Sequence, residues 1–260
     1  MLFRSGLASM RPVINAVGVR AMPGMGRTFT RPKITQHTSV GVQGSELDEL
    51  SSQALVIDPV TVNKGTYGGY VTLSEQDVDF TDPAALQLVL NDLAAQYAIT
   101  TEAAACTALV GAAGSSESVV DWTDAQEVAA KVWAARTSIS ASGYLPTHIF
   151  ASSDRVAQLG TLATTTGELL FPNLNPSNAL GSLSPATSGG QPFGLTLVES
   201  YQLPAETFIV GNSRGLELYE QQRGAIQVSK PEVLGVTVAF RGYFATLAID
   251  NSKFVSLVND

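Results

Sequence analysis

The sequence is poor in residues that hold a fold together through sulfur or metal. Its 260 residues include one cysteine, Cys106, and two histidines, His37 and His148. A single cysteine excludes a disulfide framework and a thiolate metal cluster, and the histidines show no ligand spacing. Cys106 lies among alanines, so we expect a small buried side chain in a helix. We therefore expect no metal and no cofactor.

Long apolar runs are also missing, which excludes a membrane-spanning helix, and no secretory signal is visible. A pI of about 4.8 gives little support to sequence-specific DNA binding. The stretch from Met1 to Arg11 contains Arg and Ser but no acid, as in a mitochondrial transit peptide. Against that alternative, the basic character continues into residues 27–35, which alternate as a strand.

Acidic residues are absent from residues 1–45, whereas all 23 acids lie in the remainder of the chain. The first 45 residues carry six bases: Arg4, Arg11, Arg20, Arg27, Arg31 and Lys33. A split of this kind suggests a basic arm that binds an acidic partner.

The composition, 45% hydrophobic and 15% charged, is that of a folded chain with one large domain or two modest ones. Residues 1–26 are punctuated by Gly and Pro and are expected to be extended. Strands at 27–35 and 54–62 flank a polar tip that contains the acidic stretch 46–49, and this pattern predicts a projecting hairpin. The extended pattern resumes at 70–76.

A long helix follows the hairpin pattern. Asp82 can cap it with Pro83 at its first position, and no breaker occurs before Val110, after which Gly111 is expected to end it. A capping box at residues 123–126 opens a second helix that Gly143 ends. The remaining elements expected are strands at 146–151, 194–198, 207–210, 225–228, 236–240, 243–249 and 254–258, a short helix from 153 and a loop at 164–190. This order indicates an α+β fold.

One motif suggests catalysis. Gly211-Asn-Ser-Arg-Gly215 matches G-x-S-x-G and follows a strand, and the helix-like residues 216–221 come next, as in the nucleophile elbow of a hydrolase. That family needs a histidine downstream of Ser213, and both histidines precede it. A tight turn explains the glycines better, although a different triad order using His148 is conceivable. Phosphate-loop and metalloprotease patterns are absent, so no catalytic residue and no enzyme activity is expected.

The order of these elements resembles the major capsid proteins of tailed double-stranded DNA phages, the Hong Kong 97-type fold. Val71–Phe80 is similar to the start of that family's spine helix, Gln191–Gly211 to its segment containing Leu-Pro, and Leu234–Phe244 to its penultimate strands. The resemblance covers residues 27–258. It implies an N-terminal arm (1–26), an extended β-hairpin loop (27–76), a peripheral domain with the spine helix (77–118 and 225–260) and an axial domain (119–224).

The resemblance implies a virion protein, assembled in the host cytoplasm, that self-assembles as hexamers and pentamers into an icosahedral head shell. Its further partners would be the portal and decoration or scaffolding proteins, with packaged DNA nearby but bound non-specifically. We expect contacts between subunits from the basic and acidic segments: Arg4, Arg11, Arg20, Glu46, Asp48 and Glu49. An encapsulin nanocompartment is the alternative, but residues 1–26 make a poor form of the amphipathic helix that encapsulins carry there.

Some members of the family link subunits by an isopeptide bond between a loop lysine and a peripheral-domain asparagine. Lys33 or Lys64 could supply the amine. Residues 225–242, where the acceptor is expected, contain no Asn, and Arg241 lies near the place of the assisting glutamate. We therefore predict no covalent cross-link.

Overall fold

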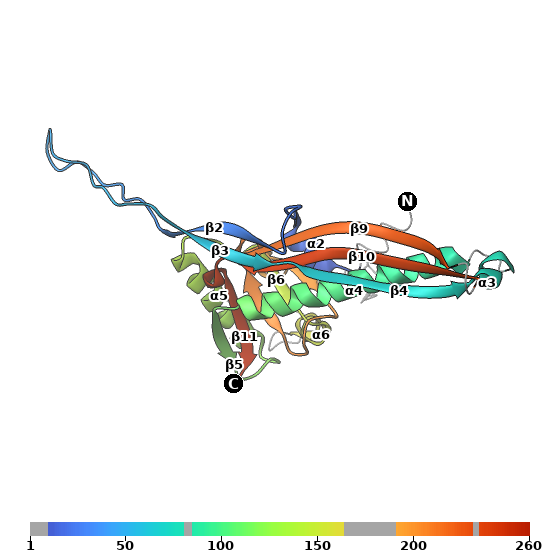
Figure 1. Ribbon diagram of the computed structural model, residues 1–260. Coiled ribbons are helices and arrows are strands. Elements are labelled where there is room, and N and C mark those ends of the chain that lie inside the picture. Colours follow the sequence, from blue (N-terminus) through green and yellow to red (C-terminus); the bar gives the residue numbers. More distant parts are fainter. Residues whose placement is uncertain (1–9, 81–84, 164–190, 231–233) are drawn as a thin grey trace. The chain divides into compact units, whose positions relative to one another are not determined.

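The computed structural model describes residues 10–80, 85–163, 191–230 and 234–260. The chain forms two units: the body, made of Met1–Met22 and Thr66–Asp260, and the hairpin unit, Pro23–Gly65. Helices and two sheets make up the body, and two strands make up the hairpin unit (Figure 1). The α+β prediction is confirmed.

The first sheet of the body has the strand order β1-β9-β10-β4. The long strands β9 (Leu216–Lys230) and β10 (Gly235–Ala248) pair antiparallel, with a register shift between Arg241 and Gly242. The other strands are β1 (Val19–Ala21), parallel to β9, and β4 (Gly65–Ser74), after which α3 (Glu75–Phe80) begins. Residues 236–240 and 243–249, expected as two strands, lie for the most part in the single strand β10 because a bulge accommodates the irregularity.

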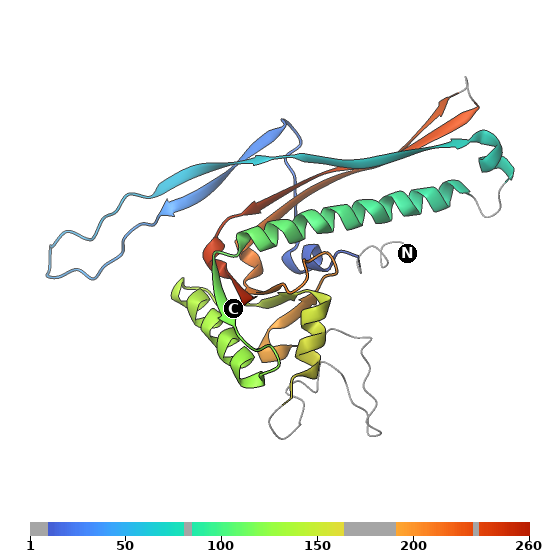
Figure 2. The same cartoon turned by 90° about the horizontal axis from the view of Figure 1, so that it is seen from below.

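The long helix α4 (Ala85–Ala112) runs beside β9 and β10 (Figure 2). The Tyr97 ring lies against Gly242, where an added Cβ would overlap the Tyr97 hydroxyl, so glycine permits the close approach. The predicted cap at Asp82 and Pro83 lies outside the described residues. The expected end at Gly111 is wrong, because the helix continues to Ala112, which is fully buried.

The second sheet has the order β5-β11-β8-β6-β7. Its strands are β5 (Ser115–Val119), β6 (His148–Ala151), β7 (Thr196–Glu199), β8 (Phe208–Gly211) and β11 (Phe254–Asn259). Two helices, α5 (Ala125–Ala141) and α6 (Ser153–Thr161), accompany it. A 3-10 turn at Pro192–Gly194 precedes β7, and another at Asn251–Lys253 precedes β11.

Side chains on both faces of this second sheet are buried. Phe208 and Val210 belong to a cluster with α5, whereas Ile209 and Phe254 belong to a cluster with Cys106 and other residues of α4. The alternation along β8 follows from the period of two in a strand. The helix α5 is capped by Asp124, which accepts a hydrogen bond from the Gln126 amide at 2.9 Å. The expected cap at Thr123 is therefore one residue early.

The hairpin unit consists of β2 (Thr28–Gln36) and β3 (Val56–Asn63), paired antiparallel with Lys33 opposite Asp58. Both strands were predicted within two residues. Among residues 23–65, Val62 is the one buried side chain.

Two further sequence expectations fail in the body. No helix was expected before residue 27, yet α2 (Pro12–Val17) forms with Pro12 at its first position and buries Val13 and Ile14. Residues 216–221 were expected to be helical and instead begin β9, because pairing with β10 fixes them as a strand. No described helix is long and apolar enough to cross a membrane.

Candidate functional site

The Gly211–Gly215 motif forms a tight connection between two strands. Ser213 opens a short 3-10 turn (Ser213–Gly215) between β8 and β9, and a strand rather than a helix follows. An added Cβ at Gly211 or Gly215 would overlap the Phe254 ring, so both glycines serve close packing. A nucleophile elbow requires a helix after the serine, and this connection has none.

His148 lies opposite Gly211 in the ladder, which brings it near the Ser213 turn. Its Nδ1 is 2.7 Å from the Thr147 hydroxyl, and its ring stacks on Phe150. Burial lowers the pKa of His148, and among the described residues no carboxylate hydrogen-bonds to its ring. A triad built on His148 therefore lacks its acid in the described part of the chain.

Thiol and metal chemistry find no site in the residues that the structure describes. Cys106 is fully buried in α4, as expected, and burial raises the pKa of its thiol to about 12. A thiol with so high a pKa is a poor nucleophile. The described residues contain no group of three or more His, Cys, Asp or Glu side chains that could hold a metal ion.

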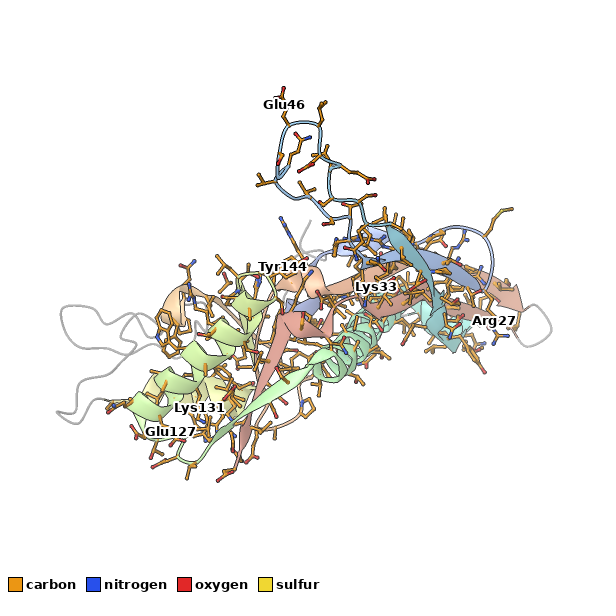
Figure 3. All side chains as sticks on the ribbon, turned by 90° about the vertical axis from the view of Figure 1, so that its left-hand side faces the viewer. Arg27, Lys33, Glu46, Glu127, Lys131 and Tyr144 are labelled. Carbon is orange, nitrogen blue, oxygen red and sulfur yellow. The ribbon has the colours of Figure 1, made fainter. Side chains whose placement is uncertain are left out.

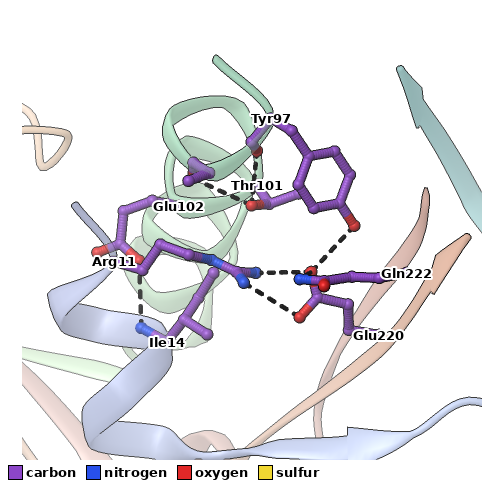
Figure 4. Close-up of polar contacts among 8 residues, drawn as sticks. Arg11, Ile14, Tyr97, Thr101, Glu102, Glu220 and Gln222 are labelled. Atoms are coloured by element: carbon purple, nitrogen blue, oxygen red, sulfur yellow. Dashed lines mark hydrogen bonds and ion pairs between the residues drawn. The ribbon is translucent and has the colours of Figure 1, made fainter. Parts of the chain in front are cut away.

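The polar centre of the body is a fully buried carboxylate, Glu102 of α4 (Figure 4). It accepts hydrogen bonds from the backbone N–H groups of Val13 (2.8 Å) and Ile14 (3.2 Å), which are unpaired donors of the first turn of α2. The Ser200 hydroxyl donates to it at 3.1 Å. Burial raises the pKa of Glu102, and the two N–H groups and Ser200 offset part of that shift.

A second buried contact lies beside Glu102. The Arg11 guanidinium binds both oxygens of Glu220 in β9, at 3.1 and 3.0 Å, and the Tyr97 hydroxyl donates to the same carboxylate at 2.9 Å. Burial and the Glu220 charge together raise the pKa of Tyr97. We call Arg11, α2, Tyr97, Glu102 and Glu220 the N-terminal anchor, because they fix the start of the described chain on α4 and β9.

The sequence analysis missed Glu102 and Glu220. The signal for Glu102 was available: it is the one charged residue between Leu93 and Ala112, in a stretch of small and apolar residues. A charge on such a helix needs a buried partner. Nothing in the sequence indicated that this partner is the backbone of residues 13 and 14.

The six residues expected at contacts between subunits fall into separate places. Arg4 lies outside the described residues. Arg11 binds Glu220, and Arg20 binds Glu217 at 2.6 Å, both within the body. Glu46, Asp48 and Glu49 lie together, exposed, in the loop of the hairpin unit, where Glu46 is at the tip (Figure 3). The contact of these residues with other subunits stays a prediction.

The lysines considered for a cross-link lie in the hairpin unit. Lys64 Nζ donates to the carbonyl oxygens of Pro23 and Met25 (2.9 Å for Met25), and so ties the two ends of the unit together. Lys33 lies on β2 opposite Asp58. The absence of a cross-link stays a prediction.

Comparison with known proteins shows the family to which this chain belongs. A family model described as phage capsid protein matches residues 58–255, more than half of the chain. No curated protein matches the sequence.

Among solved structures, a chain of Microbacterium phage Oxtober96 superposes with a TM-score of 0.71 at 12% identity, covering 95% of this chain and 90% of that chain. A chain of Mycobacterium phage Bobi superposes with a TM-score of 0.70 at 14% identity, covering 96% of this chain and 90% of that chain. The capsid structure of the cyanophage P-SCSP1u superposes with a TM-score of 0.72 at 11% identity, covering 95% of this chain and 88% of that chain. At these identities the likeness concerns the fold, and it confirms the Hong Kong 97-type prediction.

Proposed function

The chain belongs to the phage capsid protein family and is a phage head-shell protein, and we propose that its copies assemble as hexamers and pentamers into an icosahedral shell around packaged double-stranded DNA. The family and the structural neighbours do not favour the encapsulin alternative.

The observation that carries this proposal is the lack of a core in the hairpin unit. A two-stranded hairpin alone is marginally stable, and here it buries one side chain of its own, Val62. Large apolar side chains on it are instead exposed: Met25, Ile34, Val40, Val42, Leu47, Leu50, Leu55, Val56 and Ile57. Exposed apolar surface of this extent is typical of a surface that binds a partner, and neighbouring copies would supply that partner in a closed shell.

We assign the parts of the subunit as the family resemblance implies. Residues 1–26 are the arm, 27–76 the extended loop, 77–118 with 225–260 the peripheral domain, and 119–224 the axial domain. The packing of α4 on the sheet of β9 and β10 supports this division, as does the position of α5, β6, β7 and β8 within 119–224. Two strands depart from it: β11 and most of β5 come from residues assigned to the peripheral domain, but they pair in the sheet of β6 and β8.

The remaining partners follow from charge and from the proposed role. The net charge of −8 disfavours tight binding of the shell to DNA, so the DNA lies close without specific contacts. The shell also receives a portal and decoration or scaffolding proteins, and it assembles in the host cytoplasm. The role is structural and without catalysis, a proposal that the capsid family supports.

Expression of the full chain, followed by size-exclusion chromatography and electron microscopy, tests the proposal. Closed particles are expected. A monomer of 27.3 kDa that hydrolyses esters would overturn it.

Two variants make this test specific. Replacing residues 38–54 by an Asn-Gly turn keeps β2 and β3 and should abolish particles without changing the circular dichroism spectrum of the body. The control Ser213→Ala leaves the hairpin unit unchanged and should assemble like the wild type.

A further inference from the structure

The body exposes an aromatic and apolar patch at the C-terminal half of α5 and the segment that follows it. Trp133 is 57% exposed, Leu145 is 60% exposed and Tyr144 is 41% exposed. Trp133 and Leu145 line a pocket of about 200 Å³ together with Pro146 and Phe193. An exposed tryptophan at a pocket is unusual for a surface that stays in water, and such residues dominate binding energy at protein interfaces.

One exposed cation lines this pocket. The Arg136 guanidinium lies 5.1 Å from the Trp133 ring centroid, and among the described residues no carboxylate pairs with it. Lys253 is buried beside Tyr144 and 3.7 Å from Asp250, so it is not available to a partner. The pocket therefore suits an apolar side chain that carries negative charge around it. We call this site the Trp133 pocket.

The hairpin unit presents such a side chain. Leu47 is 95% exposed and stands between Glu46 and Asp48, with Glu49 next and Leu50 64% exposed. Its backbone has φ 73°, a left-handed conformation that costs a leucine energy and that clusters at functional positions. The turn is held by the Asp48 N–H donating to the Ser45 carbonyl (3.1 Å) and by the Gln43 amide donating to the Asp48 carbonyl (2.7 Å).

We propose that Leu47 of one copy docks in the Trp133 pocket of another copy, with Glu46, Asp48 and Glu49 facing Arg136. This inference rests on the proposed self-assembly and names the contact that it uses. The occupant is a second copy because the chain itself carries both complementary surfaces: an exposed leucine flanked by three acidic residues, and an apolar pocket lined by an exposed arginine. A single contact of this size is weak, but a closed shell repeats it, so the contacts reinforce one another.

Disulfide trapping in assembled particles of the full chain tests the contact. Leu47→Cys with Leu145→Cys should give a ladder of covalent oligomers on a non-reducing gel after mild oxidation. The wild-type thiol, Cys106, is buried and does not contribute. The matched control pairs Leu145→Cys with Met25→Cys, which is 90% exposed at the other end of the hairpin unit and should give no ladder.

Charge exchange gives a second readout. Arg136→Glu should lower the yield of particles about tenfold, and combining it with Glu46→Lys, Asp48→Lys and Glu49→Lys should restore most of it. Particles without a ladder from the 47–145 pair, or with an equal ladder from the control pair, would overturn the docking and leave shell assembly intact. A wild-type chain that forms no particles would instead overturn the proposed function.

Discussion

The body and the hairpin unit differ in where their apolar side chains find partners. In the body, strands such as β8 bury side chains on both faces, against α5 on one side and against residues of α4 on the other. In the hairpin unit, every side chain of β2 and β3 except Val62 is exposed or half-buried. The body therefore buries its apolar side chains within its own fold, whereas we propose that the apolar side chains of the hairpin unit are buried against neighbouring copies.

Truncating the same residue type in each unit gives the largest contrast. Leu218 in β9 is fully buried, so Leu218→Ala should lower the free energy of unfolding by about 3–5 kcal/mol through lost burial and a cavity. Leu47→Ala should change it by less than about 0.5 kcal/mol, because Leu47 is exposed. Guanidinium unfolding of the purified chain, followed by circular dichroism, measures both changes. Equal losses of unfolding free energy in the two variants would contradict the difference between the body and the hairpin unit.

The N-terminal anchor should give the next effect in size. Glu102→Ala leaves the N–H groups of Val13 and Ile14 without their acceptor and should cost about 2 kcal/mol of unfolding free energy. Glu102→Gln keeps an amide oxygen as acceptor without a buried charge and should cost clearly less. If the Val13 and Ile14 amides exchange faster in Glu102→Ala but not in Glu102→Gln, the lost stability lies at α2. Equal exchange of these amides in the two variants would argue against the capping role of Glu102.

The pH dependence of stability tests the same carboxylate more finely. Burial raises the pKa of Glu102 above its ordinary value of 4.5, so the folded chain binds this proton more readily than the unfolded chain. The contribution of Glu102 to the unfolding free energy should therefore be greatest below pH 4.5, its ordinary pKa. This contribution should fall as the pH rises through the raised pKa of the folded state. Relative to Glu102→Gln, the wild type should gain stability as the pH is lowered through this window. A relative loss on acidification would contradict the assignment.

The smallest effect is expected at the base of the hairpin unit. Lys64→Met removes the contacts to the carbonyls of Pro23 and Met25, which are solvent-exposed, and should cost about 0.5 kcal/mol. The change should be confined to faster exchange of amides within residues 23–65. Amides of β8 in the body serve as the internal reference, and their exchange should stay as in the wild type.

Local patterns predicted the elements whose stability depends on neighbours in sequence. The long helix α4, the two hairpin strands and α5 follow from apolar periodicity and end signals, and their predicted bounds agree with the structure within a few residues. Residues 216–221 were expected to be helical after the Gly211–Gly215 motif, but they begin β9, where residues 216–219 are all buried. Its partner strand decides its conformation, and pairing of this kind is invisible to local pattern.

The candidate site divides in the same way. The acids at 46–49 stand out as a charge cluster in a polar loop, and the structure does place them together. Arg11 was singled out, but its partner Glu220 lies 209 residues away, and Val13 is 89 residues from Glu102. Contacts at such separations follow from the tertiary fold, so the sequence alone did not indicate the N-terminal anchor.

The position of β11 sets the order in which a newly made subunit can fold. This strand lies between β5 and β8, and its Val255 pairs with Ser115, 140 residues earlier. At about 5–20 residues per second, a ribosome needs on the order of 10 s to make that interval. Until β11 emerges, β5 has no neighbouring strand and the apolar face of α5 lacks Val255 and Leu257. A subunit thus completes its second sheet only after β11 has been made, well after β5.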